Sequence, residues 1–192
     1  VVVVVSKRGN TYILDRESGL SLFKISKKRS PVSNVPGEKT SPYQLKVDLP
    51  EPICRNKMTE NELSDLPYVN KKKLKEIFSK SETGFPIPPK IGTKNIQLAG
   101  CVRWAGASID TKKNIMYVSA DKSPYLVSII NNPGWIGRYT HKWEQFVDEK
   151  NYPAVKPPWG SIVALNLNSG KIIWKIPFGE WEDLKKINIR KT

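Results

Sequence analysis

The apolar positions of the chain gather in three short segments that have the pattern of β hairpins. In residues 1–15, β-branched residues stand on both sides of a Lys-Arg-Gly-Asn turn, an arrangement that suits two buried strands. Residues 108–120 place turn-forming residues at 110–114 ahead of a strand over 115–119. Residues 161–176 alternate apolar and polar positions around an Asn-Ser-Gly turn, where glycine can adopt a positive φ. The pattern predicts an all-β chain.

One segment departs from this pattern and predicts a helix. Residues 59–80 begin with Thr59 and Glu62, whose spacing forms a capping box ahead of leucine, isoleucine and phenylalanine residues. Pro67 interrupts the segment, so we expect a short helical turn followed by a helix over 71–80.

Two further stretches, residues 28–57 and 81–98, are rich in Pro, Ser, Lys and Gly and show no periodicity. We expect both to be long loops. Loops of this length in a compact β protein are usually functional or inserted.

The first and last hairpin segments share an internal repeat. Each has an Asx residue, a glycine four positions later and an aromatic residue four positions after that: Asp15, Gly19 and Phe23 in one copy, Asn166, Gly170 and Trp174 in the other. The Asx oxygen caps the turn, the glycine supplies its left-handed position, and the aromatic ring leaves the second strand on a fixed face.

Repeated hairpins with one aromatic residue per unit are typical of β-propeller blades, whose sheets stack on their neighbours. In that arrangement Trp174 wedges one blade against the next. An ordinary β sandwich, with Phe23 and Trp174 as core residues, fits the two copies as well, so the repeat alone leaves both folds open.

Composition narrows the classes of partner. At 192 residues and 39% hydrophobic, the chain can bury one domain-sized core. Its formal charge of +14 raises the possibility of a polyanion partner, but the lysines are scattered without interleaved aromatic residues, so we predict no nucleic-acid partner. Cys54 and Cys101 belong to no CxxC or Cys/His cluster, which indicates no metal site and leaves their role open.

Residues 164–174 resemble the tryptophan-docking repeat of the pyrroloquinoline quinone (PQQ) dehydrogenases, A-x-D-x-x-x-G-K-x-x-W, with Asn166 in place of the usual Asp. The order of the surrounding segments resembles the C-terminal half of the membrane-type glucose dehydrogenase branch of that family. The similarity covers nearly the whole chain, with residues 28–57 and 131–150 matching only loosely.

The resemblance implies an eight-bladed quinoprotein propeller, of which a chain this short supplies about two to three four-stranded antiparallel blades. We therefore expect residues 1–192 to be a partial propeller domain and a fragment of a longer enzyme, with long loops and one short helix. Its blade strands are predicted near residues 1–25, 100–130 and 160–178, with an insertion that carries the helix at 59–80.

In function, the resemblance implies oxidation of a sugar or alcohol by hydride transfer to PQQ, with electrons passed to ubiquinone or a cytochrome. The aspartate base and the calcium ligands of the family are expected upstream, in the parent chain with the remaining blades. We therefore assign no catalytic or metal-binding residue here, and expect the chain alone to be inactive. We expect a periplasmic location, with any inner-membrane attachment supplied by a preceding segment.

Three residues are candidates for cofactor binding. Lys7 falls where the family has its cofactor lysine, whose ammonium can polarise a quinone oxygen. Trp104, preceded by Arg103, resembles a tryptophan segment near the cofactor floor, although a packed indole fits it equally well. Trp159 resembles a structural tryptophan and is interpreted as core, and His141 is placed in a loop without a catalytic partner.

The same repeats occur in non-catalytic propeller scaffolds, such as outer-membrane assembly factors. The long Pro-rich loops and the helix near 71–80 favour the enzyme, because scaffold propellers tend toward short uniform turns.

Overall fold

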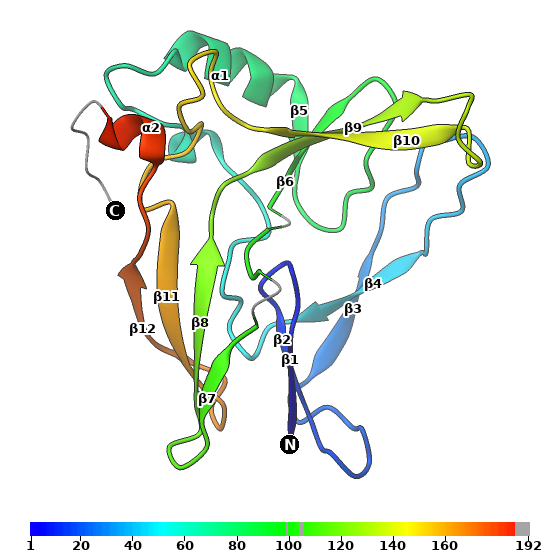
Figure 1. Cartoon of the computed structure of the whole chain (residues 1–192). Helices are drawn as coiled ribbons and strands as arrows, with labels where there is room; N and C mark the ends of the chain where they lie inside the picture. Colours follow the sequence, from blue (N-terminus) through cyan, green and yellow to red (C-terminus); the bar gives the residue numbers. More distant parts are fainter. Residues whose placement is uncertain (99, 104–105, 187–192) are drawn as a thin grey trace.

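A computed structural model describes residues 1–98, 100–103 and 106–186, which form a mainly β structure with two four-stranded and two two-stranded sheets (Figure 1). The strands are β1 (Val2–Val5), β2 (Thr11–Leu14), β3 (Ile25–Arg29), β4 (Tyr43–Val47), β5 (Ser81–Thr83), β6 (Lys94–Gln97), β7 (Ser108–Asp110), β8 (Ile115–Asp121), β9 (Tyr125–Asn131), β10 (Tyr139–Gln145), β11 (Gly160–Asn166) and β12 (Ile172–Pro177). The helices are the 3-10 turn η1 (Glu60–Glu62), α1 (Lys71–Ser79) and α2 (Glu182–Lys185).

One sheet is a complete antiparallel blade with the strand order β12-β11-β8-β7. Its centre is the pairing of β8 with β11, in which Val118 lies opposite Val163. Both residues are buried because this face of the blade is covered. The β9–β10 hairpin leaves the blade between β8 and β11 and joins another sheet (Figure 1).

The β1–β2 hairpin forms part of a second blade and packs on the first. Ser21 forms an isolated antiparallel bridge with Leu14 of β2. Between the two blades lies a core that includes Ile13, Met116, Val163, Leu165 and the partly buried Phe23. Repeated hairpins that stack face to face in this way make the fold an all-β partial propeller, as the sequence predicts.

The other four-stranded sheet has the order β10-β9-β6-β5 and lies beyond the end of β8 (Figure 1). In contrast to the expected antiparallel blades, β5 runs parallel to β6. This sheet shares a separate core with α1, in which Leu74, Phe146 and Trp159 are buried. The chain thus has two cores, one between the blades and one under the helix.

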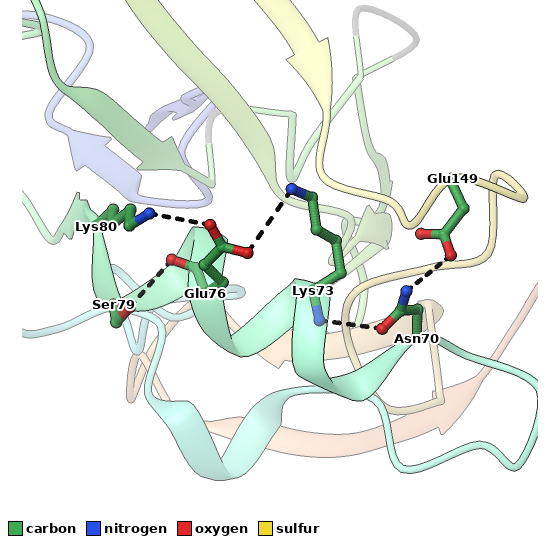
Figure 2. A network of polar contacts seen from close by, with 6 residues as sticks. All are labelled: Asn70, Lys73, Glu76, Ser79, Lys80 and Glu149. Carbon is green, nitrogen blue, oxygen red and sulfur yellow. Dashed lines mark hydrogen bonds and ion pairs between the residues drawn. The ribbon is translucent and has the colours of Figure 1, made fainter.

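Helix α1 confirms the sequence prediction almost to the residue. Asn70 caps it by accepting a hydrogen bond from the backbone N–H of Lys73, 3.1 Å away, and donates another from its side chain to Glu149 (Figure 2). Farther along the helix, Glu76 lies between Lys73 and Lys80 (Figure 2). The predicted capping box is also present, since Glu62 accepts a hydrogen bond from the N–H of Thr59.

Several predicted loops and strands require correction. The stretches 28–57 and 81–98 are not loops throughout: the first contains most of the β3–β4 hairpin and the second contains β5 and β6. His141 lies in strand β10 rather than in a loop, and α2 is a second short helix. These strands escaped prediction because most of β3–β4 and β10 faces solvent, and exposed strands show no apolar alternation.

Strand β1 is also less buried than predicted. Val2 and Val4 are exposed, and only the other face of the strand, with Val3 and Val5, packs on the core. No helix among the described residues is long and apolar enough to span a bilayer.

Candidate cofactor-binding site

Lys7 lies at the tip of the tight turn between β1 and β2. The N–H of Gly9 donates to the carbonyl of Ser6 at 2.8 Å, and the N–H of Ser6 donates to the carbonyl of Asn10 at 2.8 Å. Gly9 has φ 82°, a left-handed conformation that favours glycine. Lys7 is exposed and Asn10 is buried, so the turn is anchored in the protein at Asn10 and Lys7 faces solvent.

The neighbouring Arg8 anchors this turn, a role that sequence reasoning missed. Its guanidinium donates to Gln97 Oε1 at 3.0 Å and lies 4.8 Å from the centre of the Phe85 ring. Burial lowers the pKa of Arg8. The Arg8 guanidinium thus lies against Gln97 and Phe85, while Lys7 is exposed. No local signal in the sequence identifies Gln97 or Phe85 as partners of Arg8.

Arg103 is held at the end of strand β8. Its guanidinium pairs with Asp121 Oδ2 at 2.6 Å, and this hydrogen bond raises the pKa of Arg103. The other carboxylate oxygen of Asp121 accepts the N–H of Ser123 at 2.7 Å. The side chain of Arg103 remains largely exposed, so Asp121 orients it and leaves it accessible to a ligand.

The segments that carry Lys7 and Arg103 meet at a disulfide. Cys54 and Cys101, whose role the sequence left open, are bonded across 47 positions, with their Cα atoms 6.1 Å apart. Gly9 packs against both cysteines, and the carbonyl of Cys101 accepts the N–H of Asp121. Two of the three predicted cofactor residues are thus attached to one buried cross-link, while Trp104 lies outside the described residues.

A cavity of about 300 Å³ opens beside Arg103. Its lining combines polar residues, among them Arg103, Asp121, Ser123, Gln145 and Glu180, with the aromatic residues Trp159, Phe178 and Trp181. Trp159 confirms its interpretation as a core residue, since it is buried and its indole N–H donates to the carbonyl of Val155 at 2.9 Å. His141 is exposed and its ring meets that of Trp143 edge-on.

Three more cations converge near the disulfide. Arg55 pairs with Glu62, and Lys175 donates to the carbonyl of Ile53 at 2.7 Å. Burial and the nearby charge of Arg55 lower the pKa of Lys122, and burial, Lys122 and Arg55 lower that of Lys175. These cations come from three distant segments, so no sequence pattern could have grouped them.

The acidic residues have different tasks. Asp15 and Asp110 confirm the prediction that they are turn residues, because each accepts backbone N–H groups two and three positions later. Among the residues that the structure describes, no group of three or more His, Cys, Asp or Glu side chains gathers as a metal site would require.

Comparison with known proteins decides the family. The model of the PQQ family described as "Glucose/ethanol/alcohol dehydrogenase, beta-propeller domain" matches residues 1–192. The chain belongs to this family of PQQ-dependent dehydrogenases. The match covers the entire chain, which favours the enzyme family over the scaffold alternative.

Two curated relatives are similar over 98% of the chain at 22% identity. They are the "Quinate/shikimate dehydrogenase (quinone)" of Acinetobacter baylyi and the "Probable quinate dehydrogenase (quinone)" of Xanthomonas campestris pv. juglandis. The chain covers 26% and 27% of these proteins, respectively, and so spans about a quarter of their length.

Proposed function

We propose that this chain contributes the cofactor-facing blades of a quinoprotein dehydrogenase that oxidises a hydroxyl group of a sugar or alcohol. The observation that carries the proposal is Lys7, which stands exposed on a turn held by Arg8 and Gly9 in a chain of this family. PQQ supplies the hydride-accepting chemistry when it is bound.

The side chains present fit such a group. PQQ carries carboxylates and quinone oxygens, for which cations are the natural partners. Lys7 and Arg103 are both exposed and lie on segments that meet at one disulfide. Lys7 would place positive charge beside an electron-rich oxygen, and Arg103, oriented by Asp121, would bind a carboxylate.

The substrate class rests on the family and on the cavity beside Arg103. A lining that combines aromatic and hydrogen-bonding side chains suits a hydroxylated carbon ring. The relatives are named for quinate and shikimate, so these hydroxy acids belong beside glucose and simple alcohols in a substrate panel. The panel is assayed on the whole parent enzyme loaded with PQQ and a soluble dye acceptor, and turnover of none of these substrates would contradict the proposed substrate class.

The remaining elements of the reaction lie outside this chain. We propose that other blades supply the aspartate base and calcium, that ubiquinone or a cytochrome takes the electrons, and that the protein works in the periplasm. On this proposal the 192-residue chain by itself does not turn over substrate.

The cofactor assignment is tested by PQQ titration of a polypeptide that contains this chain and its neighbouring blades. We expect Lys7→Ala to weaken binding about tenfold or more, the loss of one charge-assisted contact. Lys112→Ala is the matched control, because Lys112 is also an exposed turn lysine but lies at the opposite end of β8 from Asp121. Equal affinities in the two variants would remove Lys7 from the site, and no binding by the wild type would refute the proposed function.

A further inference from the structure

We propose that the Cys54–Cys101 disulfide is a positioning element, which sets the Lys7 turn and the Arg103 segment relative to each other. The inference rests on the proposed function of those two cations as cofactor partners. It assigns to the cross-link a role in ligand geometry beyond its contribution to stability.

The contact with the Lys7 turn is unusually close. A Cβ placed on Gly9 would lie 2.7 Å from the Sγ of Cys101 and 2.9 Å from the backbone nitrogen of Cys54. The N–H of Ile53 donates to the carbonyl of Gly9 at 2.9 Å. Gly9 is two residues from Lys7, so the disulfide and its flanking backbone form the surface on which this turn rests.

The contact with the Arg103 segment runs through Asp121. The carbonyl of Cys101 accepts the N–H of Asp121 at 2.8 Å, and Asp121 holds the Arg103 guanidinium at 2.6 Å. The Sγ of Cys54 lies 3.6 Å from the carbonyl oxygen of Asp121. The Sγ of Cys101 therefore lies beside Gly9 of the Lys7 turn, and the Sγ of Cys54 lies beside Asp121, which holds Arg103.

Both cysteines lie outside the strands. Cys54 and Cys101 are 5% and 1% exposed and belong to connecting segments, of which the Cys101 segment is bonded to a strand through the N–H of Asp121. Without the cross-link, strands β8 and β11 keep their pairing while the two segments lose their shared anchor. The expected result of its loss is local displacement of the two cations rather than loss of the blade.

A first experiment measures amide hydrogen exchange in the chain with Cys54→Ser and Cys101→Ser combined, and needs no cofactor. We expect faster exchange at Gly9, whose amide donates to Ser6 within the Lys7 turn, and at Asp121, whose amide donates to Cys101, with unchanged protection at Val163 in the blade centre. Unchanged exchange at Gly9 and Asp121 would overturn the proposal. Uniformly faster exchange, Val163 included, would also overturn it, because the bond would then be purely stabilising.

A second variant leaves the disulfide intact and covers the case in which the double variant does not fold. Gly9→Ala forces a methyl group into the cysteines, whereas Gly19→Ala imposes a similar positive φ with nothing within 4 Å. We expect faster exchange at Asp121 in Gly9→Ala and not in Gly19→Ala. Equal behaviour of the two variants would contradict the close coupling of turn and disulfide.

The functional arm is a double-mutant cycle on PQQ affinity in the polypeptide with its neighbouring blades. Removal of the disulfide should weaken PQQ binding about tenfold when Lys7 is present and much less in a Lys7→Ala background, because the cross-link acts partly through that lysine. An equal loss in both backgrounds would overturn the positioning role. Absence of PQQ binding in the wild type would refute the proposed function, while the exchange measurements would still decide whether the disulfide holds the two segments together.

Discussion

The ring of Phe23 lies against Gly170. A Cβ on Gly170 would be 3.1 Å from Cε1 of Phe23, and also 3.0 Å from the Cα of Pro50. Phe23 is the aromatic residue of the first repeat and Gly170 is the glycine of the second, so one repeat closes directly on the next. In this contact the aromatic residue of one repeat packs against the turn of the other, as the wedge predicted from the repeat requires.

Trp174, the aromatic residue of the second repeat, does not fill such a place. It is 39% exposed and packs beside Tyr117 of its own sheet, with ring centroids 5.9 Å apart. The described residues bring no further sheet against this face, so the wedging of Trp174 against a further blade stays a prediction. Phe23 shows that the motif itself works as predicted.

Gly170→Ala should destabilise the chain more than Gly19→Ala. Both glycines occupy the same turn position, with φ values of 69° and 71°, so both variants incur the left-handed penalty of about 1–2 kcal/mol. Only at Gly170 does the new methyl group meet Phe23 and Pro50, which adds roughly 1–3 kcal/mol of overpacking. Urea unfolding of the two variants measures the difference, and equal stabilities would show that the contact between the repeats is unimportant.

Asn166→Asp should leave stability within about 0.5 kcal/mol, whereas Asn166→Ala should cost about 1 kcal/mol. The Oδ1 of Asn166 accepts the N–H groups of Asn168 and Ser169 at 2.9 and 3.0 Å. In the first repeat, the carboxylate of Asp15 accepts the two equivalent N–H groups, so an aspartate can replace the asparagine. Thermal unfolding of both variants would test this, and similar losses would show that the turn requires the amide.

The sequence predicted the parts of the fold that local patterns determine. The hairpins at residues 1–15 and 161–176 have alternating strands and turn glycines, and helix α1 has a cap and helical spacing, so each could be recognised within a short window. The parallel pairing of β5 with β6 could not, because strands of three and four residues are too short to show alternation, and the other partner of β6, β9, lies farther along the chain. Burial of β1 was overestimated because five valines do not show which face is covered.

The candidate site was predictable only through resemblance. Lys7 and Arg103 came from matches to family segments, whereas the disulfide that joins their surroundings depends on two loop cysteines 47 positions apart. Arg8 was missed because its partners, Gln97 and Phe85, come close only in the folded chain. Such long-range contacts leave no periodic trace in the sequence.

Glu51 should make stability depend on pH at the acidic end. Its carboxylate accepts the N–H of Ile172 at 2.8 Å and pairs with Lys171 at 3.1 Å, and these contacts hold its pKa below the usual 4.5. A lowered folded-state pKa means that the contribution is fully present above about pH 4.5 and is lost as the pH falls through the folded-state value.

The measurement is the difference in unfolding free energy between the wild type and Glu51→Gln from pH 7 to pH 3. We expect the wild type to be more stable at pH 7 and the difference to shrink toward pH 3. Glu38→Gln, at an exposed loop position, is the control and should show little difference at any pH. A difference for Glu51→Gln that stays constant or grows on acidification would contradict the assigned role.

Replacement by phenylalanine should destabilise the chain at one tryptophan and leave its stability nearly unchanged at another. Trp159 is 4% exposed, its N–H satisfies the carbonyl of Val155, and its ring meets that of Trp181, so Trp159→Phe leaves both a cavity and an unpaired buried carbonyl. We expect a loss of about 1–3 kcal/mol in urea unfolding. Trp174→Phe retains an aromatic ring on an exposed face and should change stability by less than about 0.5 kcal/mol. If the two losses were equal, the core beneath α1 would not depend on Trp159, and the division of the chain into two cores would need revision.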